Sequence, residues 1–364
     1  MDFTFTAEQD ALREAVKGFL ADRVNGDYVR AMADDDAGYT PELWDEMVRL
    51  GWTGVLAPAE LGGLGLGIIE ACVVLEEMGR LPLPGPYLSS AVMATLAAKH
   101  LGQADLLRSL ASGSAKGAIA LEENGYGHPV DTFRTRARRK GSGWVANGLK
   151  PLVLGGRAAD WVIIVARTEE GARSFLLDGP VGDPVPTMDP TRRATRIELV
   201  DEPVVPIGPQ GDQTALWRLI CDDIAVAIGA ELVGASEQAF DLAVEYAKMR
   251  VQFGRPIATF QAIKHKTVDM LHAIEMARVA MHYGAWAADA GHPDRSRAAA
   301  MCKSYAGSAA VKVTGDAIQV HGGVGFTWNC DAHFLYKRAK QDDLLLGGQS
   351  HLRKRLASMI IDPE

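Results

Sequence analysis

The sequence contains no long apolar run and no excess of basic charge. No stretch approaches the roughly 18 to 20 apolar residues that a membrane-spanning helix needs, and the first residues lack a basic segment followed by an apolar core. The 364 residues include 38 Lys and Arg against 46 Asp and Glu, whereas nucleic-acid-binding proteins usually present a basic face. We therefore expect a cytoplasmic protein that binds neither membranes nor nucleic acids.

Cysteine is also scarce. The four cysteines lie far apart, with no CxxC pair and no histidine at ligand spacing, and are Cys72, Cys221, Cys302 and Cys330. This pattern favours neither a zinc site nor a disulfide framework, and it predicts reduced, buried thiols. Hydrophobic residues make up 48% of the chain and charged residues 23%, as in ordinary globular proteins. Because single cores stop growing at about 250 to 300 residues, we expect more than one domain.

Helical spacing dominates the first part of the chain. Between residues 7 and about 111, apolar residues recur every three and four positions, which predicts several short helices. The segment 57–67 interrupts this pattern with Pro58 and paired glycines, and 81–86 (LPLPGP) interrupts it again. Residues 1–115 are therefore predicted to form an N-terminal α-helical domain.

The pattern then changes twice. Residues 116–210 contain short β-branched or alternating segments separated by Gly, Asp and Pro, which predicts a middle β-barrel or β-sandwich domain. Residues 211–364 return to long helical periods and predict a C-terminal four-helix bundle. Its helices are expected over 215–250, 258–289, roughly 295–320 and 331–361. The fold class is thus a multidomain α+β protein.

Two segments of the predicted bundle carry residues suited to a diphosphate and an adenine. Arg250 ends a long helix just before a turn at Gly254 and Pro256, where its guanidinium could grip a diphosphate while Phe253 lies against an adenine. A surface arginine and a core phenylalanine are the simpler alternative. The wider string RxxFGRPIxxFQ, which ends at Gln261, favours the ligand-binding interpretation.

The second segment is QVHGGVGF, residues 319–326. Glycines at a helix end let the backbone approach phosphate oxygens and expose N–H donors. A plain helix stop is the alternative, and it explains one glycine better than the three at positions 322, 323 and 325.

Three strings, together with the order of the domains, resemble the acyl-CoA dehydrogenase family over essentially the whole chain. They are APAELGGLGLGIIEACVVLEEMGRLPLPGP, RVQFGRPIATFQAIKHKTVDM and QVHGGVGF. The resemblance implies FAD and an oligomer, since in this family the last two strings hold the ADP half of a flavin whose ring lies in the neighbouring chain. It gives that role to Arg250, Phe253, Gln261, Gln319, Gly322 and Gly323.

The sequence departs from the family at the catalytic base. The family removes a proton from an acyl thioester with a glutamate, and the two positions that resemblance gives to this glutamate are Gly347 and about Ile224. Asp223 is a weak candidate for a displaced base, because one helical position turns a side chain by about 100°. For Asp222 and Asp223 a solvated or capping role is favoured. A non-catalytic role is likewise favoured for Asp342, Asp343 and His351.

A second departure lies in the predicted β domain. The family surrounds the flavin ring with hydroxyls, amides and a tryptophan from two loops, whereas the corresponding strings here read LEENGYGH (121–128) and KPLVLGG (150–156). Apolar residues in place of these donors would leave the oxygens of a buried flavin unpaired, at about 1 to 3 kcal/mol for each group. We expect no flavin ring against this chain's own β domain.

The leading hypothesis is a subunit of an α2β2 acyl-CoA dehydrogenase that lacks the base and lends the ADP half of the FAD site to a catalytic partner. It resembles the heterotetrameric enzymes of bacterial steroid side-chain β-oxidation, with a steroid CoA thioester as substrate and an electron-transferring flavoprotein as acceptor. Two alternatives remain open. One is a homotetrameric dehydrogenase that uses Asp223, and the other is a non-enzymatic acyl-CoA-binding or structural homologue without flavin.

Overall fold

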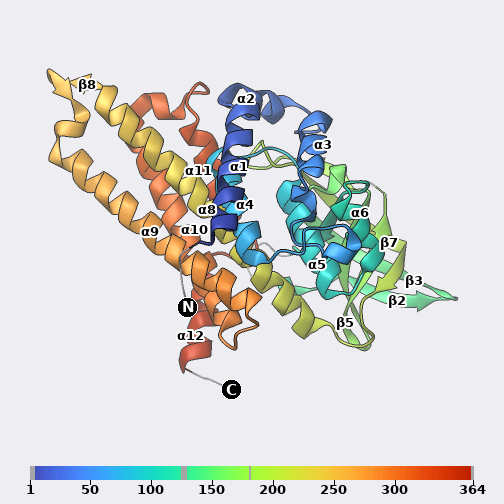
Figure 1. Ribbon diagram of the computed structural model, residues 1–364. Helices are drawn as coiled ribbons and strands as arrows, with labels where there is room; N and C mark the ends of the chain where they lie inside the picture. Colours follow the sequence, from blue (N-terminus) through green and yellow to red (C-terminus); the bar gives the residue numbers. More distant parts are fainter. Residues whose placement is uncertain (1–4, 124–128, 180–181, 362–364) are drawn as a thin grey trace. The chain divides into compact units, whose positions relative to one another are not determined.

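The computed structural model describes residues 5–123, 129–179 and 182–361 (Figure 1). The chain divides into two compact units. The bundle unit comprises Met1–Arg30, Cys72–Leu83 and Ala225–Glu364, and the barrel unit comprises Ala31–Ala71 and Pro84–Ile224. The domain boundaries predicted at residues 115 and 210 remain a prediction. No helix in the described part of the chain is long and apolar enough to cross a membrane.

The predicted helices of the first part are confirmed. They are α1 (Ala7–Arg23), α2 (Gly26–Asp34), α3 (Pro41–Arg49), α4 (Ile68–Arg80), α5 (Thr95–His100) and α6 (Ala104–Ala111). Both predicted interruptions fall where expected, since α4 begins after residue 67 and ends before residue 81. A wide π-type helical stretch at Tyr87–Ala94 was not predicted, and each of its residues is buried.

The strands of the barrel unit close into a barrel. They are β1 (Gly117–Ala120), β2 (Arg136–Lys140), β3 (Gly143–Leu154), β4 (Trp161–Thr168), β5 (Gly171–Asp178), β6 (Asp183–Val185) and β7 (Ala194–Ile207). Going around the barrel, β4 pairs with β2, β2 with β3, β3 with β7 and β7 with β5, and β5 pairs with β4 to close the ring. A helical turn, α7 (Pro129–Thr132), precedes β2.

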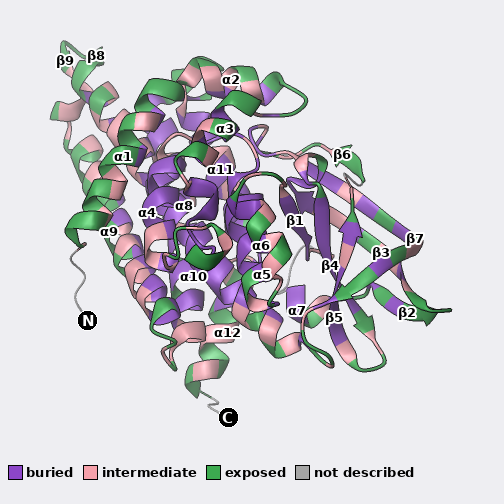
Figure 2. Ribbon diagram, turned by 45° about the vertical axis from the view of Figure 1, so that its right-hand side comes forward, coloured by how far each residue is buried: buried purple, intermediate pink, exposed green. Residues whose placement is uncertain are grey.

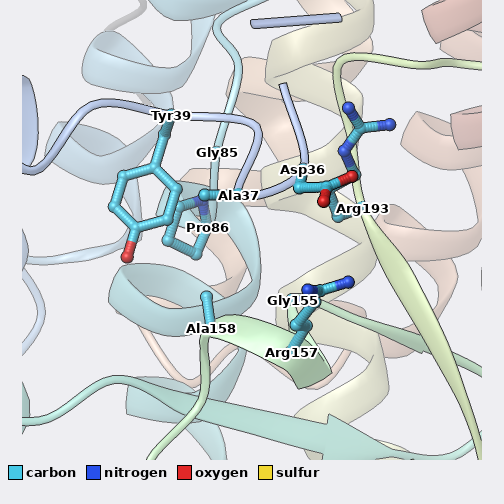
Figure 3. A pocket seen from close by; sticks show the side chains of 9 residues that line it. All are labelled: Asp36, Ala37, Tyr39, Gly85, Pro86, Gly155, Arg157, Ala158 and Arg193. Atoms are coloured by element: carbon cyan, nitrogen blue, oxygen red, sulfur yellow. The ribbon is translucent and has the colours of Figure 1, made fainter. Parts of the chain in front are cut away.

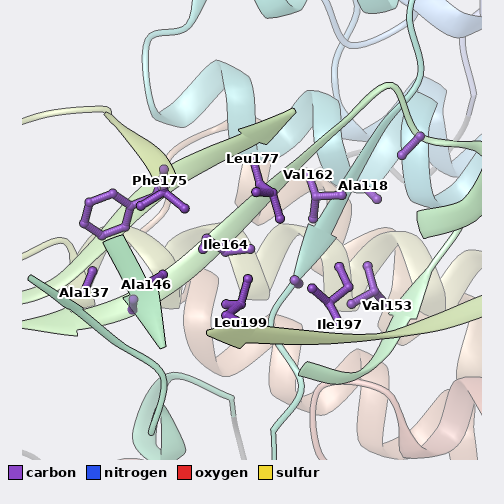
Figure 4. Close-up of a cluster of buried hydrophobic side chains, with 14 residues drawn as sticks. Ala118, Ala137, Ala146, Val153, Val162, Ile164, Phe175, Leu177, Ile197 and Leu199 are labelled. Carbon is purple, nitrogen blue, oxygen red and sulfur yellow. The ribbon is translucent and has the colours of Figure 1, made fainter. Parts of the chain in front are cut away.

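The barrel interior is filled by small and branched apolar side chains (Figure 4). Alternate residues of a strand face opposite sides, and β4 accordingly contributes Val162, Ile164 and Ala166 to this core. Phe175 is the largest member, and the partly buried Trp144 packs against it with ring centroids 5.3 Å apart. Val153 and Leu199 belong to the same cluster, from β3 and β7.

The C-terminal helices are long, as predicted, except for the last one. The bundle is made by α8 (Thr214–Met249), which begins in the barrel unit, and by α9 (Gln261–Asp289), α10 (Arg295–His321), α11 (Ala332–Leu344) and α12 (Gln349–Ile361). The single helix expected over 331–361 is wrong, because Leu346 and Gly347 both have positive φ angles and separate α11 from α12.

Two glycines bring α4 and α8 into backbone contact within the bundle unit. A Cβ atom added to Gly79 would lie 2.2 Å from the carbonyl oxygen of Glu231 on α8. One added to Gly234 would lie 1.8 Å from the carbonyl oxygen of Glu76 on α4. No side chain can replace either hydrogen atom unless the helices separate, so this crossing requires glycine on both sides.

We expect Gly234→Ala to destabilise the chain by about 3 kcal/mol or more, or to prevent folding, because an extra methyl group in a closed interface forces a backbone shift. Urea unfolding of both proteins measures the difference.

Gly18→Ala is the matched control for this substitution. Gly18 is exposed within α1, and an added Cβ would meet nothing within 4 Å. Alanine there should raise stability by about 0.5 to 1 kcal/mol. A Gly234→Ala protein as stable as the unmodified chain would contradict the proposed role of the crossing.

Candidate functional site

A short hairpin extends from the end of the bundle unit. Strand β8 (Val251–Gln252) pairs with β9 (Arg255–Pro256), and the turn residues Phe253 and Gly254 have φ angles of 52° and 76°. Two positive φ angles are typical of a type I′ turn. Figures 1 and 2 show this exposed hairpin beyond the adjoining ends of α8 and α9.

Phe253 combines backbone strain with exposure. A bulky residue in the left-handed region costs roughly 1 to 2 kcal/mol, and its side chain is nevertheless 92% exposed, with one edge contact to Phe260. The alternative of a core phenylalanine is therefore wrong. Strain that the fold itself does not use is a reason to look for a function.

The hairpin adjoins the end of α10. The ring of Tyr246, near the end of α8, stacks on His321 at the end of α10 with centroids 4.5 Å apart. Ile257 and Ile263, which follow the hairpin, pack against the same buried cluster as Val320. The structure therefore brings the two segments that the sequence singled out to one end of the bundle unit.

Three polar side chains at this end of the bundle unit are exposed to solvent. Arg250, Gln261 and Gln319 are exposed, and none of their side chains forms a hydrogen bond or an ion pair with any residue that the structure describes. Three donor-bearing side chains at the ends of three adjoining helices suit a polar ligand that spans them.

The three glycines after α10 differ in whether the fold requires a glycine at their position. Gly322 has φ 63° and ψ −143°, a region that is essentially restricted to glycine, and Gly325 is buried with the carbonyl oxygen of Ile318 2.8 Å from an added Cβ. Gly323 has no positive φ, and an added Cβ would meet nothing within 4 Å. The fold does not require a glycine at position 323.

The sequence analysis missed two apolar side chains in this segment. Val324 and Phe326 lie in the 3₁₀ turn Gly322–Phe326 and are both largely exposed. Like Phe253, they are apolar side chains exposed at this end of the bundle unit. Their signal in the sequence is two apolar residues placed between glycines, beyond the last helical period.

The two strings that correspond to the family's flavin-ring loops belong to the barrel unit. Leu121 and Leu154 are buried and Val153 is part of the barrel core, so these side chains pack within the chain itself. An isolated bridge joins Glu122 to Leu152 and holds the two strings together. The remaining residues of the first string, 124–128, lie outside the described residues.

A buried ion pair fastens the same two strings. Lys150 Nζ is 2.5 Å from a carboxylate oxygen of Glu123 and donates to the carbonyl of Val165 at 2.8 Å. Burial alone would raise the pKa of Glu123, but Lys150 and the amide of Arg134 hold that pKa below its usual value.

The expectation of a solvated or capping role for Asp222 and Asp223 is wrong. Both are 1% exposed and lie inside α8, and a carboxylate oxygen of Asp223 is 2.8 Å from His100 Nε2 in the barrel unit. Asp223 is thus committed to an internal contact. Ile224, the neighbouring position, is fully buried.

Comparisons with known proteins agree with the resemblance. The acyl-CoA dehydrogenase N-terminal domain matches residues 6–117, and the acyl-CoA dehydrogenase C-terminal domain matches residues 222–361. The acyl-CoA dehydrogenase IpdE2 of Mycobacterium tuberculosis is 33% identical over 97% of each chain. The chain belongs to the acyl-CoA dehydrogenase family.

Two solved structures extend this relation. The ChsE4–ChsE5 complex from Mycobacterium tuberculosis contains a chain with a TM-score of 0.91 and 26% identity over 100% of both chains. A variant of the Tcur3481–Tcur3483 steroid ACAD gives a TM-score of 0.90 and 30% identity over 98% of both chains. The fold is that of the family, with an N-terminal helical domain, a middle β-barrel and a C-terminal helical domain.

In this acyl-CoA dehydrogenase, the position that resemblance gives to the base is unsuited to a glutamate. Gly347 is buried with φ 92°, and it follows Leu346 with φ 59°. Nearby Asp343 is engaged, since Gln349 Nε2 donates to its carboxylate at 3.0 Å and the buried Lys303 donates to its carbonyl at 3.0 Å. His351 also makes contacts within the chain.

We expect Phe253→Gly to raise the stability of the isolated chain by about 0.5 to 1 kcal/mol, because relief of the left-handed strain exceeds the entropy cost of glycine. Urea unfolding measures this change. Val251→Gly is the control in the same hairpin, and it should lose stability because Val251 lies in strand β8, away from the turn. Equal losses from both substitutions would contradict the strain at Phe253.

We expect Lys150→Met to destabilise the chain by about 3 to 5 kcal/mol, because it leaves the Glu123 carboxylate buried beside an apolar side chain. The double variant Lys150→Met/Glu123→Gln should lose clearly less in the same denaturation experiment. Because its pKa is lowered in the folded chain, the Glu123 carboxylate contributes stability at neutral pH, and this contribution is lost as the pH falls through that lowered pKa. Equal losses in the single and double variants would contradict the argument.

Proposed function

We propose that this chain is a subunit of a heterotetrameric FAD-dependent acyl-CoA dehydrogenase that lends the ADP half of the FAD site to a catalytic partner subunit. The reaction is the α,β-desaturation of a CoA thioester, with a steroid side chain as the acyl group. FAD supplies the hydride acceptor when it is bound. The contrast between an open ADP end and a closed ring side carries the proposal.

The open end suits the ADP half of FAD. Arg250 offers a guanidinium to the diphosphate, Gly322 and Gly323 expose backbone close to it, and Phe253 offers an aromatic face to the adenine. Gln261 and Gln319 add amide donors at the same end of the bundle unit. A ligand held there would relieve the exposure of Phe253 and use donors that the chain leaves uncommitted.

The residues that correspond to the family's flavin-ring loops do not suit a flavin ring. Leu121, Val153 and Leu154 provide no hydrogen bonds from their side chains and are already packed in the chain's own core. The two places for a base carry Gly347 and Ile224, and Asp223 is paired with His100. This combination supports a base and a ring pocket supplied by another subunit rather than a homotetramer with a displaced base.

An exposed apolar stripe on α9 supports assembly with further subunits. Val268, Leu271, Met276 and Val279 lie on one side of the helix and are all exposed, with Val268 63% exposed. Exposed apolar side chains that gather on one side of a helix suit contact with another protein, although the exposed His272 and Glu275 lie among them.

The relatives support the choice of partner and substrate. One is a complex of two named chains, ChsE4 and ChsE5, and another is described as a steroid ACAD. We extend a paired assembly and a steroid thioester to this chain on that basis, with an electron-transferring flavoprotein as the electron acceptor.

We expect Arg250→Ala to lower the FAD content of the complex between this chain and a co-expressed catalytic partner, because the diphosphate loses a charge-assisted contact of about 1.5 to 3 kcal/mol. Flavin absorbance per polypeptide, with native mass to confirm the tetramer, measures the effect. The unmodified complex should contain one FAD for each unlike pair, and the chain purified alone should be colourless.

Lys248→Ala is the matched control. Lys248 is an exposed cation at the end of the same helix and is paired with Glu245, so its removal should leave the flavin content unchanged. Full FAD occupancy after Arg250→Ala would contradict the assignment. A yellow homotetramer with one FAD per chain would contradict the shared site and would favour Asp223 as the base.

A further inference from the structure

The barrel unit contains a cavity of about 250 Å³ that includes none of the residues assigned to the ADP half of FAD (Figure 3). Three segments form its walls. The loop between α2 and α3 contributes Asp36 and Tyr39, the segment before the π-type stretch contributes Pro86, and the turn after β3 contributes Arg157 and Ala158. The cavity is smaller than a drug-sized pocket and suits a ligand with about one ring.

The walls of the cavity are fixed by close contacts. Gly38 has φ 73°, and an added Cβ would lie 2.9 Å from Cγ of Arg193, which also lines the cavity. Gly85 has φ 101°, and an added Cβ would lie 2.7 Å from Cβ of Tyr39. Arg193 Nη2 donates to the carbonyl of Ala33 at 2.9 Å. The loop is thus held against β7, and the cavity exists before any ligand arrives.

The charges of the cavity are not balanced within it. Neither Asp36 nor Arg157 forms an ion pair with a described residue, and both are exposed at the cavity. The Nε atom of Arg193 is buried and has no hydrogen-bond partner among the described residues. Two guanidinium groups against one carboxylate leave a local charge of about +1, which calls for a singly charged anion.

The remaining walls are apolar. In Figure 3 the Tyr39 ring and Pro86 lie on the side of the cavity opposite the Arg157 guanidinium, and Ala158 lies below them. A ligand that fits this arrangement has an apolar body against Tyr39 and Pro86 and an anionic end toward the Arg157 guanidinium.

We propose that this cavity binds a small organic carboxylate of about one ring. Its carboxylate pairs with Arg157, which can accept it with two parallel hydrogen bonds, and its ring lies against Tyr39 and Pro86. A phosphate group carries a charge of about −1.5 to −2 at neutral pH, so Asp36 disfavours it relative to a carboxylate. The proposal does not depend on the FAD site or on a partner subunit.

Titration of the full chain with benzoate, followed by ligand-observed NMR, tests the proposal. We expect saturable binding with a Kd on the order of 1 mM or below. Benzamide, which has the same shape without the charge, should bind about tenfold more weakly or worse, and inorganic phosphate should also bind more weakly than benzoate.

Arg157→Gln should weaken benzoate binding about tenfold or more, with an unchanged unfolding midpoint because Arg157 is exposed and unpaired. Arg49→Gln, which removes an exposed arginine on α3 of the same unit, should leave benzoate binding unchanged. Absence of saturable benzoate binding, equal binding by Arg157→Gln, or benzamide bound as tightly as benzoate would each overturn the proposal.

Discussion

The backbone contact between α4 and α8 is the constraint around which the bundle unit is organised. Because Gly79 and Gly234 leave no side chain between the helices, the carboxylates beside the contact, Glu76 and Glu231, are carried into the interior. Burial raises the pKa of Glu76, although Arg278 opposes this effect. A carboxylate in such a place requires cationic partners, and these come from the surrounding helices.

Those partners tie the neighbouring helices to the contact. Arg278 of α9 pairs with Glu76, and the buried Arg338 of α11 lies 2.5 Å from Glu231 and donates to the carbonyls of Pro82 and Leu83 at 3.3 and 3.2 Å. Ion pairs therefore join α9 to α4 and α11 to α8, while α4 and α8 meet directly at the backbone contact. A hairpin at the end of such a framework can hold a strained, exposed phenylalanine, because the helices that carry it are fixed.

The sequence predicted the elements well where the reason was local. Helical spacing correctly predicted several short helices between residues 7 and 111, with interruptions at 57–67 and 81–86, because periodicity and Gly or Pro breaks act within a few residues. The break between α11 and α12 was missed, since only the backbone angles of Leu346 and Gly347 reveal it. A glycine followed by a second glycine was the only hint in the sequence.

The candidate site shows the same division. Motif strings were enough to select Arg250 and Gly322 as candidate ligand-binding residues. Whether a neighbouring side chain is buried or exposed could not be predicted in this way, because burial depends on contacts between distant segments. Phe253 and Asp223 illustrate this, because the aromatic residue proved exposed and the charged residue proved buried against His100, 123 positions away in sequence. Hydrophobicity alone would have placed both the other way.

The backbone at Gly347 does not suit a glutamate, the residue that the resemblance would place there. Gly347 has a φ angle that residues with a Cβ rarely adopt, and Leu346 before it is already left-handed, so a glutamate at position 347 would add strain to a strained segment. The segment also ends α11 beside Asp343 and begins α12 at Gln349, which are joined by a hydrogen bond. Restoring a carboxylate there would require the turn between the two helices to be rebuilt. The glycine turn at this position is thus part of how the last two helices are connected, and it agrees with the proposed subunit that relies on a partner for the chemistry.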